Sequence, residues 1–324
     1  MLALQDQTWA ADYPVTAVLA GLVVLVVGAD LLVRGAVWIA LVVGMSRMSV
    51  GLTLVAIGTS LPELLVSLTA ARTGSGEIAM GNVLGSNVAN TMLIIGAAAA
   101  ICAIRLQVRW LELGWSLVAT LVLAVPFVMI CGVERWLAAV MVAMLVVFCT
   151  HLLIRERGNS APEEGARPRG TPLGWLLHLA LLGGGFVGLT YGADWLVEGA
   201  KVIAKSLGMS EALIGLTIVA IGTSLPELAT SVVAAIRRQP EICIGNVLGS
   251  NIFNVGAVLG VTGLLQPFPV AHDKFRMAMI VTAASAIALV AVLRLWKGVP
   301  RLVGAVFLLG YFGFLGYQVY SEAV

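Results

Sequence analysis

The sequence predicts an all-α polytopic membrane protein whose ten transmembrane helices form two inverted five-helix repeats. Three observations support this prediction: the composition, the number of long apolar runs and a duplicated sequence block. The chain has 324 residues, of which 60% are hydrophobic and only 11% are charged, and its mean hydropathy is +1.02. A soluble protein has about a quarter of its residues charged, so the composition indicates an integral membrane protein.

Ten apolar runs are long enough to cross a membrane, since a spanning helix needs about 20 apolar residues. The first and sixth runs have about 30 residues, so these helices must tilt or project beyond the bilayer. The expected spans are 13–43, 50–71, 78–103, 113–131, 135–154, 173–206, 213–236, 242–265, 276–294 and 301–320.

One extended polar stretch, RERGNSAPEEGARPRGTP at 155–172, divides the chain. Its composition is typical of a short flexible linker, and it is too small for a regulatory domain. We therefore expect a first five-helix half at 1–154, a short cytoplasmic linker at 155–172, and a second, inverted half at 173–324.

Two sequence blocks occur twice with the same offset of 164 residues. GLTLVAIGTSLPEL at 51–64 recurs as GLTIVAIGTSLPEL at 215–228, and GNVLGSN at 81–87 recurs at 245–251. The repeats begin at spans one and six, an odd number of spans apart, so the second copy should cross the membrane upside down. Inverted repeats are typical of secondary transporters, which bind their substrate near the midplane where the copies meet.

The basic residues predict the orientation. With the N-terminus outside, the cytoplasmic loops hold twelve Lys and Arg and the outer loops hold five. Cytoplasmic loops carry the excess of positive charge, so we expect a multi-pass protein of the cell (inner) membrane with both termini outside. The cytoplasmic twelve are Arg47, Arg105, Arg109, Arg155, Arg157, Arg167, Arg169, Arg237, Arg238, Arg294, Lys297 and Arg301.

Each copy of the longer block places oxygen-bearing side chains on one helix face. Thr59 and Ser60 precede Glu63 by four and three residues, so a helix stacks these three side chains together. Pro62 has no N–H and its ring crowds the carbonyl of Gly58, so we expect a kink that releases backbone carbonyls. An ionisable group at membrane depth is costly, which makes Glu63 a candidate functional residue.

The shorter block adds a polar stripe on the following span, where Asn82, Ser86 and Asn90 are spaced by four residues. Together the two copies offer only oxygen: two carboxylates, four hydroxyls from the two GTS sequences, amides and loosened carbonyls. Calcium takes about six to eight oxygen ligands and two carboxylates balance its charge, whereas zinc and copper favour thiolate or imidazole. The second copy supplies Thr223, Ser224, Pro226, Glu227, Asn246, Ser250 and Asn254.

These blocks resemble the α-repeats of the calcium/cation antiporter superfamily, specifically the prokaryotic type of its sodium/calcium exchanger branch. The resemblance covers both motifs in full and most of spans 1–3 and 6–8. It implies ten helices and alternating access. It also implies that Glu63 and Glu227 hold Ca²⁺, with backbone oxygens of Thr59 and Thr223 completing the site.

The resemblance implies sodium sites as well, and about three Na⁺ per Ca²⁺, so that each cycle would move net charge across the membrane. Asn90 and Asn254 would line the central position. The sodium ligands would be the carbonyls of Ala56 and Ala220 with Thr59, Ser60, Ser86, Thr223, Ser224 and Ser250.

The chain departs from other parts of the superfamily pattern. Potassium-dependent exchangers carry aspartate where this chain has Asn254, so we expect no potassium requirement. The large regulatory loop of animal exchangers is missing, and the glutamate–histidine motif of the proton/calcium branch does not occur.

Charged residues also occur in the two long spans. Asp30 and Arg34 are four residues apart, which favours a local ion pair. The sixth span has Asp194, Glu198 and Lys201. For the charged residues of both spans we expect a structural or vestibule role and no direct coordination of the ions.

The sequence leaves alternatives to a sodium-coupled exchanger open. Buried glutamates can also carry protons, so a proton-coupled Ca²⁺/cation antiporter is the first alternative. A channel needs a continuous ring of ligands, and antiparallel halves fit that poorly. An enzyme needs a nucleophile with a base or a metal dyad, and no histidine or cysteine lies within the motifs. The partners expected are Ca²⁺, Na⁺ and the lipid bilayer, with no cofactor, no nucleic acid and no obligate protein partner.

Overall fold

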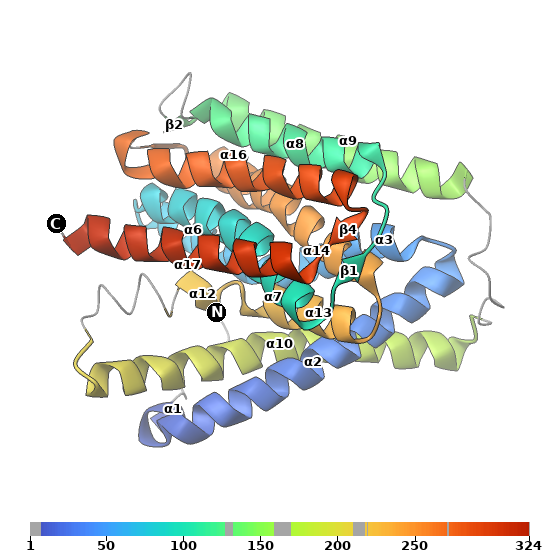
Figure 1. Ribbon diagram of the computed structural model, residues 1–324, viewed down its shortest axis with the longest axis horizontal. Helices are drawn as coiled ribbons and strands as arrows, with labels where there is room; N and C mark the ends of the chain where they lie inside the picture. Colours follow the sequence, from blue (N-terminus) through green and yellow to red (C-terminus); the bar gives the residue numbers. More distant parts are fainter. Residues whose placement is uncertain are drawn as a thin grey trace.

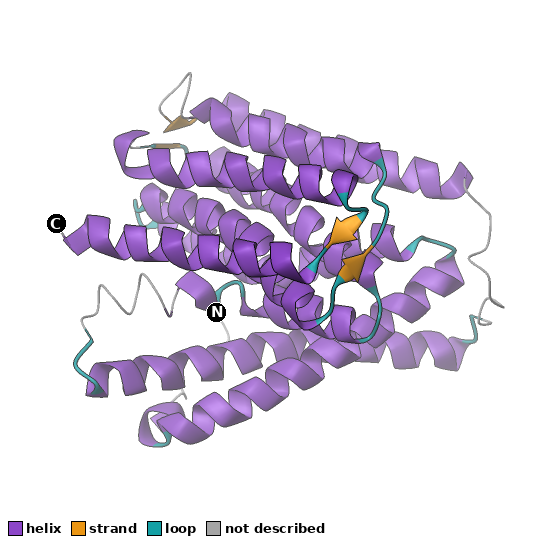
Figure 2. Ribbon diagram, viewed as in Figure 1, coloured by secondary structure: helices purple, strands orange, loops and turns teal. Residues whose placement is uncertain are grey.

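The computed structural model shows a bundle of helices, as expected (Figure 1). The structure describes residues 8–126, 132–158, 170–209, 218, 220–270 and 272–323. Within these residues the strands are only two residues long and lie in loops at the ends of the bundle (Figure 2). The predicted fold class, an all-α membrane protein, is confirmed.

The helices and strands follow one another in a similar order on either side of the linker. Before it come α1 (Thr8–Asp12), α2 (Pro14–Val43), α3 (Arg47–Val50), η1 (Gly51–Val55), α4 (Ala56–Thr59), α5 (Leu61–Arg72), α6 (Gly76–Val88), η2 (Ala89–Ile94), α7 (Ile95–Ile101), β1 (Ile104–Arg105), α8 (Trp110–Val125), β2 (Gly132–Val133) and α9 (Arg135–Gly158). After it come α10 (Pro172–Ser206), α12 (Ala220–Gly222), α13 (Leu225–Ile236), α14 (Pro240–Phe253), η5 (Asn254–Leu259), α15 (Gly260–Leu265), β3 (Phe268–Pro269), α16 (His272–Leu295), β4 (Gly298–Val299) and α17 (Arg301–Ala323). The η segments are π-helical.

Among the described residues, seven helical segments are long and apolar enough to cross a membrane. An eighth is a bent pair formed by Arg47–Thr59 and Leu61–Arg72. Two shorter apolar helices, α8 and α13, overlap the expected spans 113–131 and 213–236, and both of these spans include residues outside the described ones. Every expected span therefore contains a described helix, and the count of ten spans in two repeats stays a prediction.

α9, the helix of the fifth expected span, continues past the expected end of that span at residue 154 and runs to Gly158. Polar contacts hold this extension in place. Arg155 forms an ion pair with Glu112 at 2.7 Å, and the carboxylate of Glu156 accepts hydrogen bonds from the start of α3. Most of the expected linker, residues 159–169, lies outside the described residues.

α2 and α10 cross each other closely and lie along one side of the bundle (Figure 1). A Cβ at Gly21 or Gly28 would lie 2.6 or 2.7 Å from backbone atoms of α10. A Cβ at Gly185 or Gly192 would come within 2.6 Å of the backbone of α2. Small residues that let backbones approach are a usual basis of helix association in membranes. We call α2 and α10 the crossed pair.

Each helix of the crossed pair ends beside a glycine with left-handed backbone geometry. The φ angle is 78° at Gly44 and 81° at Gly208. Beyond Gly44, the N–H of Met45 donates to the carbonyl of Ala40 at 2.9 Å, and an equivalent bond follows Gly208. Glycine adopts this conformation without the strain that a Cβ would cause. The two GMS sequences therefore end their helices in the same way.

Short strands link the two halves of the chain at both ends of the bundle (Figure 2). β1 pairs with β4, with Ile104 opposite Val299, and β2 pairs with β3, with Val133 opposite Phe268. Each pair takes one strand from either side of the linker. This reciprocal pairing is what a two-fold relation between the halves would produce.

The spans that carry GNVLGSN lie at the centre of the bundle. In their most apolar windows, 94% of the residues of Pro240–Leu265 and 72% of those of Gly76–Ile101 are buried. The corresponding shares are 11% for Pro172–Ser206 and 17% for Arg301–Ser321. Polar groups exposed to hydrocarbon are costly, so this arrangement keeps the polar block away from lipid.

Candidate ion-binding site

The helix that carries the first repeated block is broken at Ser60. α4 ends at Thr59, Ser60 has φ −87° and ψ 3°, and α5 begins at Leu61 with a bend of 44°. Pro62 lies in the first turn of α5, where its missing N–H is tolerated. Its ring would crowd the carbonyl of Gly58 in a straight helix, so the expected kink is present and has the expected cause.

The second copy is broken in the same way, at Ser224, where φ is −91° and ψ is 4°. The glycine before each break faces the crossed pair. A Cβ at Gly58 would lie 1.6 Å from the ring of Phe186, and a Cβ at Gly222 would lie 2.6 Å from a methyl group of Val197. Only glycine lets the helix approach the crossed pair this closely at the break.

Glu63 and Glu227 follow the two breaks and are both buried, each 1% exposed. Neither forms an ion pair with Lys or Arg in the part of the chain that the structure describes. The hydroxyl of Ser60 donates to Oε1 of Glu227 at 3.2 Å, while Oε2 of each glutamate has no hydrogen-bond partner. Buried carboxylates without a counter-charge are unfavourable until a cation or a proton neutralises them.

An asparagine from the next helix braces each glutamate helix. Nδ2 of Asn82 donates to the backbone carbonyl of Glu63 at 3.2 Å and to the hydroxyl of Ser67 at 3.0 Å. Asn246 makes the equivalent two bonds in the second copy, at 3.4 and 3.0 Å. The side-chain oxygen of Asn246 also accepts from the hydroxyl of Thr59 at 3.2 Å, so this residue connects the two copies.

Reciprocal asparagine pairs join the two GNVLGSN helices. Asn90 donates to Asn251 at 3.0 Å, and Asn254 donates to Asn87 at 3.0 Å. Asn251 in turn donates to Thr91 at 3.1 Å. Asn251 and Asn254 are the repeat equivalents of Asn87 and Asn90, so one contact is made twice in opposite directions, as across a two-fold axis.

Asn90 and Asn254 lie in the π-helical segments η2 and η5. A π-helical turn takes an extra residue and disturbs the regular pattern of backbone hydrogen bonds, and such turns are frequent at functional sites. The widened turns therefore occur where the polar stripe of each copy meets the other copy.

Several buried side chains on these helices have an oxygen without a hydrogen-bond partner, and each of these side chains is at most 4% exposed. Unpaired buried oxygens cost free energy, so a group of them indicates a ligand. Among the described residues no cluster of three or more His, Cys, Asp or Glu occurs, and the donor set suits a hard cation. The oxygens are Oε2 of Glu63 and Glu227, Oγ of Ser86, Ser224 and Ser250, Oγ1 of Thr230, and Oδ1 of Asn90 and Asn254.

Three expected ligands of the first copy already bond to protein groups. The hydroxyls of Thr59 and Ser60 donate to Asn246 and Glu227, as described above. The carbonyl of Ala56 accepts from the backbone N–H of Ser60 at 3.0 Å. A carbonyl or hydroxyl oxygen has two lone pairs, so these groups can still share an oxygen with a cation.

The expected ligands of the second copy have different surroundings. Thr223 is half-buried and lines a cavity, and the buried hydroxyl of Ser224 has no partner. Ala220 begins α12, so its carbonyl lies one turn before the break. Residues 210–217, which include the start of the second repeated block, lie outside the described residues.

Sequence reasoning missed two pairs of polar residues at this site. Asn87 and Asn251 are the partners of the central asparagines, and Ser67 and Ser231 accept hydrogen bonds from the bracing asparagines. The sequence contains a signal for both pairs. Asn87 and Asn251 end the GNVLGSN strings, and each serine follows its glutamate by four residues, on the same helix face.

A cavity of about 240 Å³ opens beside the second break. Asp194, Glu198 and Lys201 of α10 line it, together with Thr223 and Pro226. Lys201 forms an ion pair with Glu198 at 2.6 Å. The three charged residues of the sixth span thus lie beside the second break, and the structural or vestibule role expected for them stays a prediction.

Comparison with known proteins decides the family. The model of the family described as sodium/calcium exchanger protein matches residues 13–154 and 177–320. The chain belongs to this family. Sodium/calcium exchanger proteins are membrane transporters and not enzymes, and the ions they move are cargo and not cofactors.

The similarity to known relatives extends over most of the chain. The sodium/calcium exchanger MaX1 of Methanosarcina acetivorans is 33% identical, over 92% of this chain and 96% of that protein. The inner membrane protein YrbG of Escherichia coli is 31% identical, over 87% and 88%. A solved structure of the sodium-calcium exchanger NCX_Mj superposes with a TM-score of 0.78 at 32% identity, covering 92% of this chain and 96% of that one.

Proposed function

We propose that this chain is a secondary active antiporter that exchanges Ca²⁺ for Na⁺ by alternating access. One observation carries the proposal: two buried glutamates without a counter-charge share their helices with paired, unpartnered hydroxyl and amide oxygens. Such a set can hold hard cations and give them up again, because no ligand binds them covalently or through sulfur. The names of MaX1 and NCX_Mj as sodium/calcium exchangers support the same reading.

The ligand assignment follows the pairing of the copies. Ca²⁺ would bind between Glu63 and Glu227, with backbone oxygens of Thr59 and Thr223 released by the two breaks. The sodium sites would use the remaining oxygens: the carbonyls of Ala56 and Ala220, the hydroxyls of Thr59, Ser60, Thr223, Ser224, Ser86 and Ser250, and the amides of Asn90 and Asn254 at the centre.

The charge on the site sets the expected stoichiometry. Two carboxylates neutralise one Ca²⁺ or two Na⁺, and neutral oxygens around Ser86 and Ser250 offer room for a third Na⁺. A cycle of about three Na⁺ per Ca²⁺ moves one net charge, worth about 2.3 kcal/mol per 100 mV. Exchange should therefore respond to the membrane potential.

The test of function is Ca²⁺ uptake into proteoliposomes loaded with Na⁺, with K⁺ present or absent and the potential clamped by an ionophore. We expect uptake that needs the Na⁺ gradient and does not need K⁺. Uptake should accelerate when the interior is made positive, because the exit of three Na⁺ for each entering Ca²⁺ carries one net positive charge outward. Uptake that ignores the potential would refute the three-for-one cycle.

Proton coupling is the second candidate, because a buried carboxyl without a counter-charge can bind a proton in place of Na⁺. Glu63 and Glu227 would then each release a proton when Ca²⁺ arrives. Uptake driven by a pH gradient alone, in the absence of Na⁺, would favour this alternative over sodium coupling.

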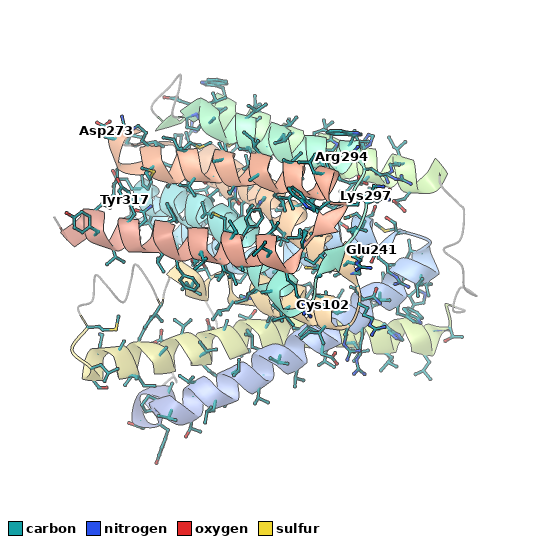
Figure 3. The ribbon with its side chains drawn as sticks, viewed as in Figure 1. Cys102, Glu241, Asp273, Arg294, Lys297 and Tyr317 are labelled. Atoms are coloured by element: carbon teal, nitrogen blue, oxygen red, sulfur yellow. The ribbon has the colours of Figure 1, made fainter. Side chains whose placement is uncertain are left out.

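We further propose two inverted five-helix halves in the inner membrane, with both termini outside and the linker in the cytoplasm. Arg294 and Lys297 lie at the same end of the bundle as Glu241, and Asp273 lies at the opposite end (Figure 3). Single cysteines at positions 163 and 273 of a Cys-free variant should react with an impermeant maleimide from opposite faces. Reaction of both from one face would contradict this topology.

A further inference from the structure

The acidic residue that both copies carry on the crossed pair has different surroundings in each copy. Asp30 and Asp194 are equivalent in the repeat. Asp30 forms an ion pair with Arg34 of its own helix at 2.8 Å and a second one with Arg237, directly after α13. Asp194 is exposed in the cavity and forms no ion pair within the described residues. Asp30 is therefore joined by an ion pair to the end of α13, whereas Asp194 has no such ion pair within the described residues.

The sequence explains why this tie occurs in one copy only. The positions equivalent to Arg34 and Arg237 are occupied by Glu198 and Thr73. Glu198 pairs with Lys201 on its own helix, and the hydroxyl of Thr73 donates to a carbonyl of its own helix at 2.9 Å. Within the described residues, no ion pair comparable to that of Asp30 links α10 to the end of α5.

Two of the residues that line the cavity have fully buried equivalents in the other copy. Val66 and Val197 line the cavity, whereas their equivalents Thr230 and Val33 are 0% and 1% exposed. The hydroxyl of Thr230 has no partner, although it is completely buried. If the two copies exchanged their conformations, a second cavity would open beside Asp30, at Thr230 and Val33, and the present cavity would close.

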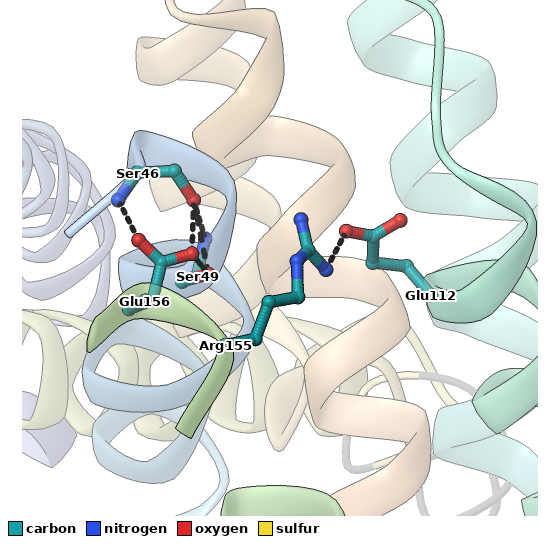
Figure 4. A network of polar contacts seen from close by, with 5 residues as sticks. All are labelled: Ser46, Ser49, Glu112, Arg155 and Glu156. Atoms are coloured by element: carbon teal, nitrogen blue, oxygen red, sulfur yellow. Dashed lines mark hydrogen bonds and ion pairs between the residues drawn. The ribbon is translucent and has the colours of Figure 1, made fainter. Parts of the chain in front are cut away.

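Other polar contacts near the linker connect α3, α8 and α9 to one another (Figure 4). The carboxylate of Glu156 accepts from the backbone N–H of Ser46 at 2.8 Å, which joins α9 to α3. Arg155 donates to Glu112 at 2.7 Å, which joins α9 to α8. These contacts connect helices outside the crossed pair, whereas the second ion pair of Asp30 connects the crossed pair to α13.

We propose that the ion pair between Asp30 and Arg237 is the lock that keeps the linker-side entrance to the ion site closed. Because the other copy has no such pair, the cavity beside Asp194 stays open when no ion is bound. This inference rests on the alternating access proposed above and adds the contact that sets the resting conformation. The lock opens when the crossed pair moves relative to α13 and separates the two charges.

A partly buried ion pair can bias the equilibrium between the conformation that is closed on the linker side and the one that is open there. The Asp30 and Arg237 side chains are 23% and 37% exposed, so water and salt screen them less than they screen a fully exposed pair. Removal of one partner leaves the other charge near apolar surroundings, which destabilises the conformation that needed the pair. Losing the lock should therefore raise the small population that is open on the linker side.

The experiment measures that population directly. Val33→Cys or Val197→Cys is introduced into a variant without Cys102, Cys131, Cys149 and Cys243, and the rate of reaction with an impermeant maleimide is measured from each face. We expect Val197→Cys to react from the outer face and Val33→Cys to react slowly from the linker face. Adding Arg237→Gln should accelerate the reaction of Val33→Cys about tenfold, the size of a typical conformational coupling.

Two matched variants separate the lock from a simple loss of charge. Arg34→Gln removes the other ion-pair partner of Asp30. This arginine lies on the same helix as Asp30 and does not connect it to α13, so the labelling rate of Val33→Cys should change less than twofold. Arg238→Gln removes a charge from the neighbouring position, which makes no ion pair among the described residues, and should have no effect. Asp30→Asn removes the pair from the other side and should reproduce Arg237→Gln.

Each outcome decides the question. The lock is refuted if Arg237→Gln and Asp30→Asn leave the labelling of Val33→Cys unchanged, or if Arg34→Gln accelerates it equally. Unchanged labelling of Val197→Cys from the outer face verifies that each variant is folded. Labelling does not require transport, so a failure of sodium-driven Ca²⁺ uptake would refute the proposed function without affecting this result.

Discussion

α5 and α13 begin with the same four residues, LPEL, and carry the two buried glutamates, but they lie in different surroundings. Leu61 is 47% exposed and the equivalent Leu225 is 9% exposed. Val66 is 41% exposed, and the equivalent Thr230 is 0% exposed. α5 packs against α6 and η5, whereas α13 packs against α2, α7 and α14.

The glutamates do not share this difference, because Glu63 and Glu227 are each 1% exposed. The repeat therefore keeps the burial of the two carboxylates constant while the packing around them differs between the copies. In an alternating-access cycle the two packings would have to be exchanged between the copies. The comparison between α5 and α13 thus separates features that are alike in both copies from features that differ between them.

The largest expected effect concerns the residues that are alike in both copies. Glu63→Gln and Glu227→Gln should each reduce Ca²⁺ transport more than 100-fold, since the charge of a carboxylate ligand stabilises a divalent ion by several kcal/mol even at an effective dielectric near 20. Initial rates of Ca²⁺ uptake into Na⁺-loaded proteoliposomes give the measurement. Glu77→Gln, which removes an exposed glutamate paired with Lys274 at 2.9 Å, is the control and should keep near-normal rates.

If only one of the two glutamine variants loses transport, the copies do not contribute equally to the calcium site. Near-normal transport in both variants would place the site elsewhere.

A smaller effect should distinguish the two glycines at the breaks. Gly58→Ala puts a methyl group into the ring of Phe186, and Gly222→Ala puts one against a methyl group of Val197. Overpacking typically costs about 1–3 kcal/mol, and we expect Gly58→Ala to lie at the upper end and Gly222→Ala at the lower. Thermal unfolding in detergent checks the order. Phe186→Leu should recover part of the loss in Gly58→Ala, and a lack of recovery would place the strain elsewhere.

The equivalent leucines test the packing difference directly. Leu225→Ala should lower the free energy of unfolding by about 2 kcal/mol, because it leaves a cavity among packed helices. Leu61→Ala should lower it by less than about 1 kcal/mol, since this side chain is already half exposed. Denaturation in mild detergent compares the two variants. Equal losses would mean that α5 is as enclosed as α13 in the membrane.

The smallest effect concerns the two serines at the breaks. The hydroxyl of Ser60 donates to Glu227 at 3.2 Å, whereas that of Ser224 is buried without a partner. Without ions, Ser60→Ala should cost about 1 kcal/mol and Ser224→Ala close to nothing. Added Na⁺ should raise the Tm of both variants less than that of the original protein, because each has lost a sodium ligand. A full response of Ser224→Ala to Na⁺ would remove Ser224 from the ligand set.

The sequence predicted the features that depend on neighbours in the chain. Pro62 explains the break at Ser60 and the four-residue spacing explains the pair of Asp30 and Arg34, since both are effects within one helix. The apolar runs located the membrane-spanning helices to within about four residues, whereas the short α1 lies before the first run. α9 and α16 each extend four residues beyond their runs, and in α9 the ion pair of Arg155 holds this extension.

Features that depend on distant partners could not be predicted. Arg237 and Asp30 are far apart in the sequence, and no local pattern indicates that α13 ends beside α2. The π-helical turn at Asn90 has the same apolar periodicity as the α-helix before it, so hydrophobicity cannot distinguish them. The ligand assignment of the individual sodium sites likewise stays a prediction, because which oxygens surround an ion is a matter of tertiary geometry.

The reciprocal asparagine bonds have a consequence for how the protein is made. Asn87 and Asn90 find their partners 167 and 161 residues further along the chain. During synthesis on the ribosome, the first half therefore enters the membrane with unpaired amides and waits for α14 to arrive. A nascent chain that has lost its second half should be recognised as unassembled and degraded, whereas the two halves made as separate polypeptides should rescue each other.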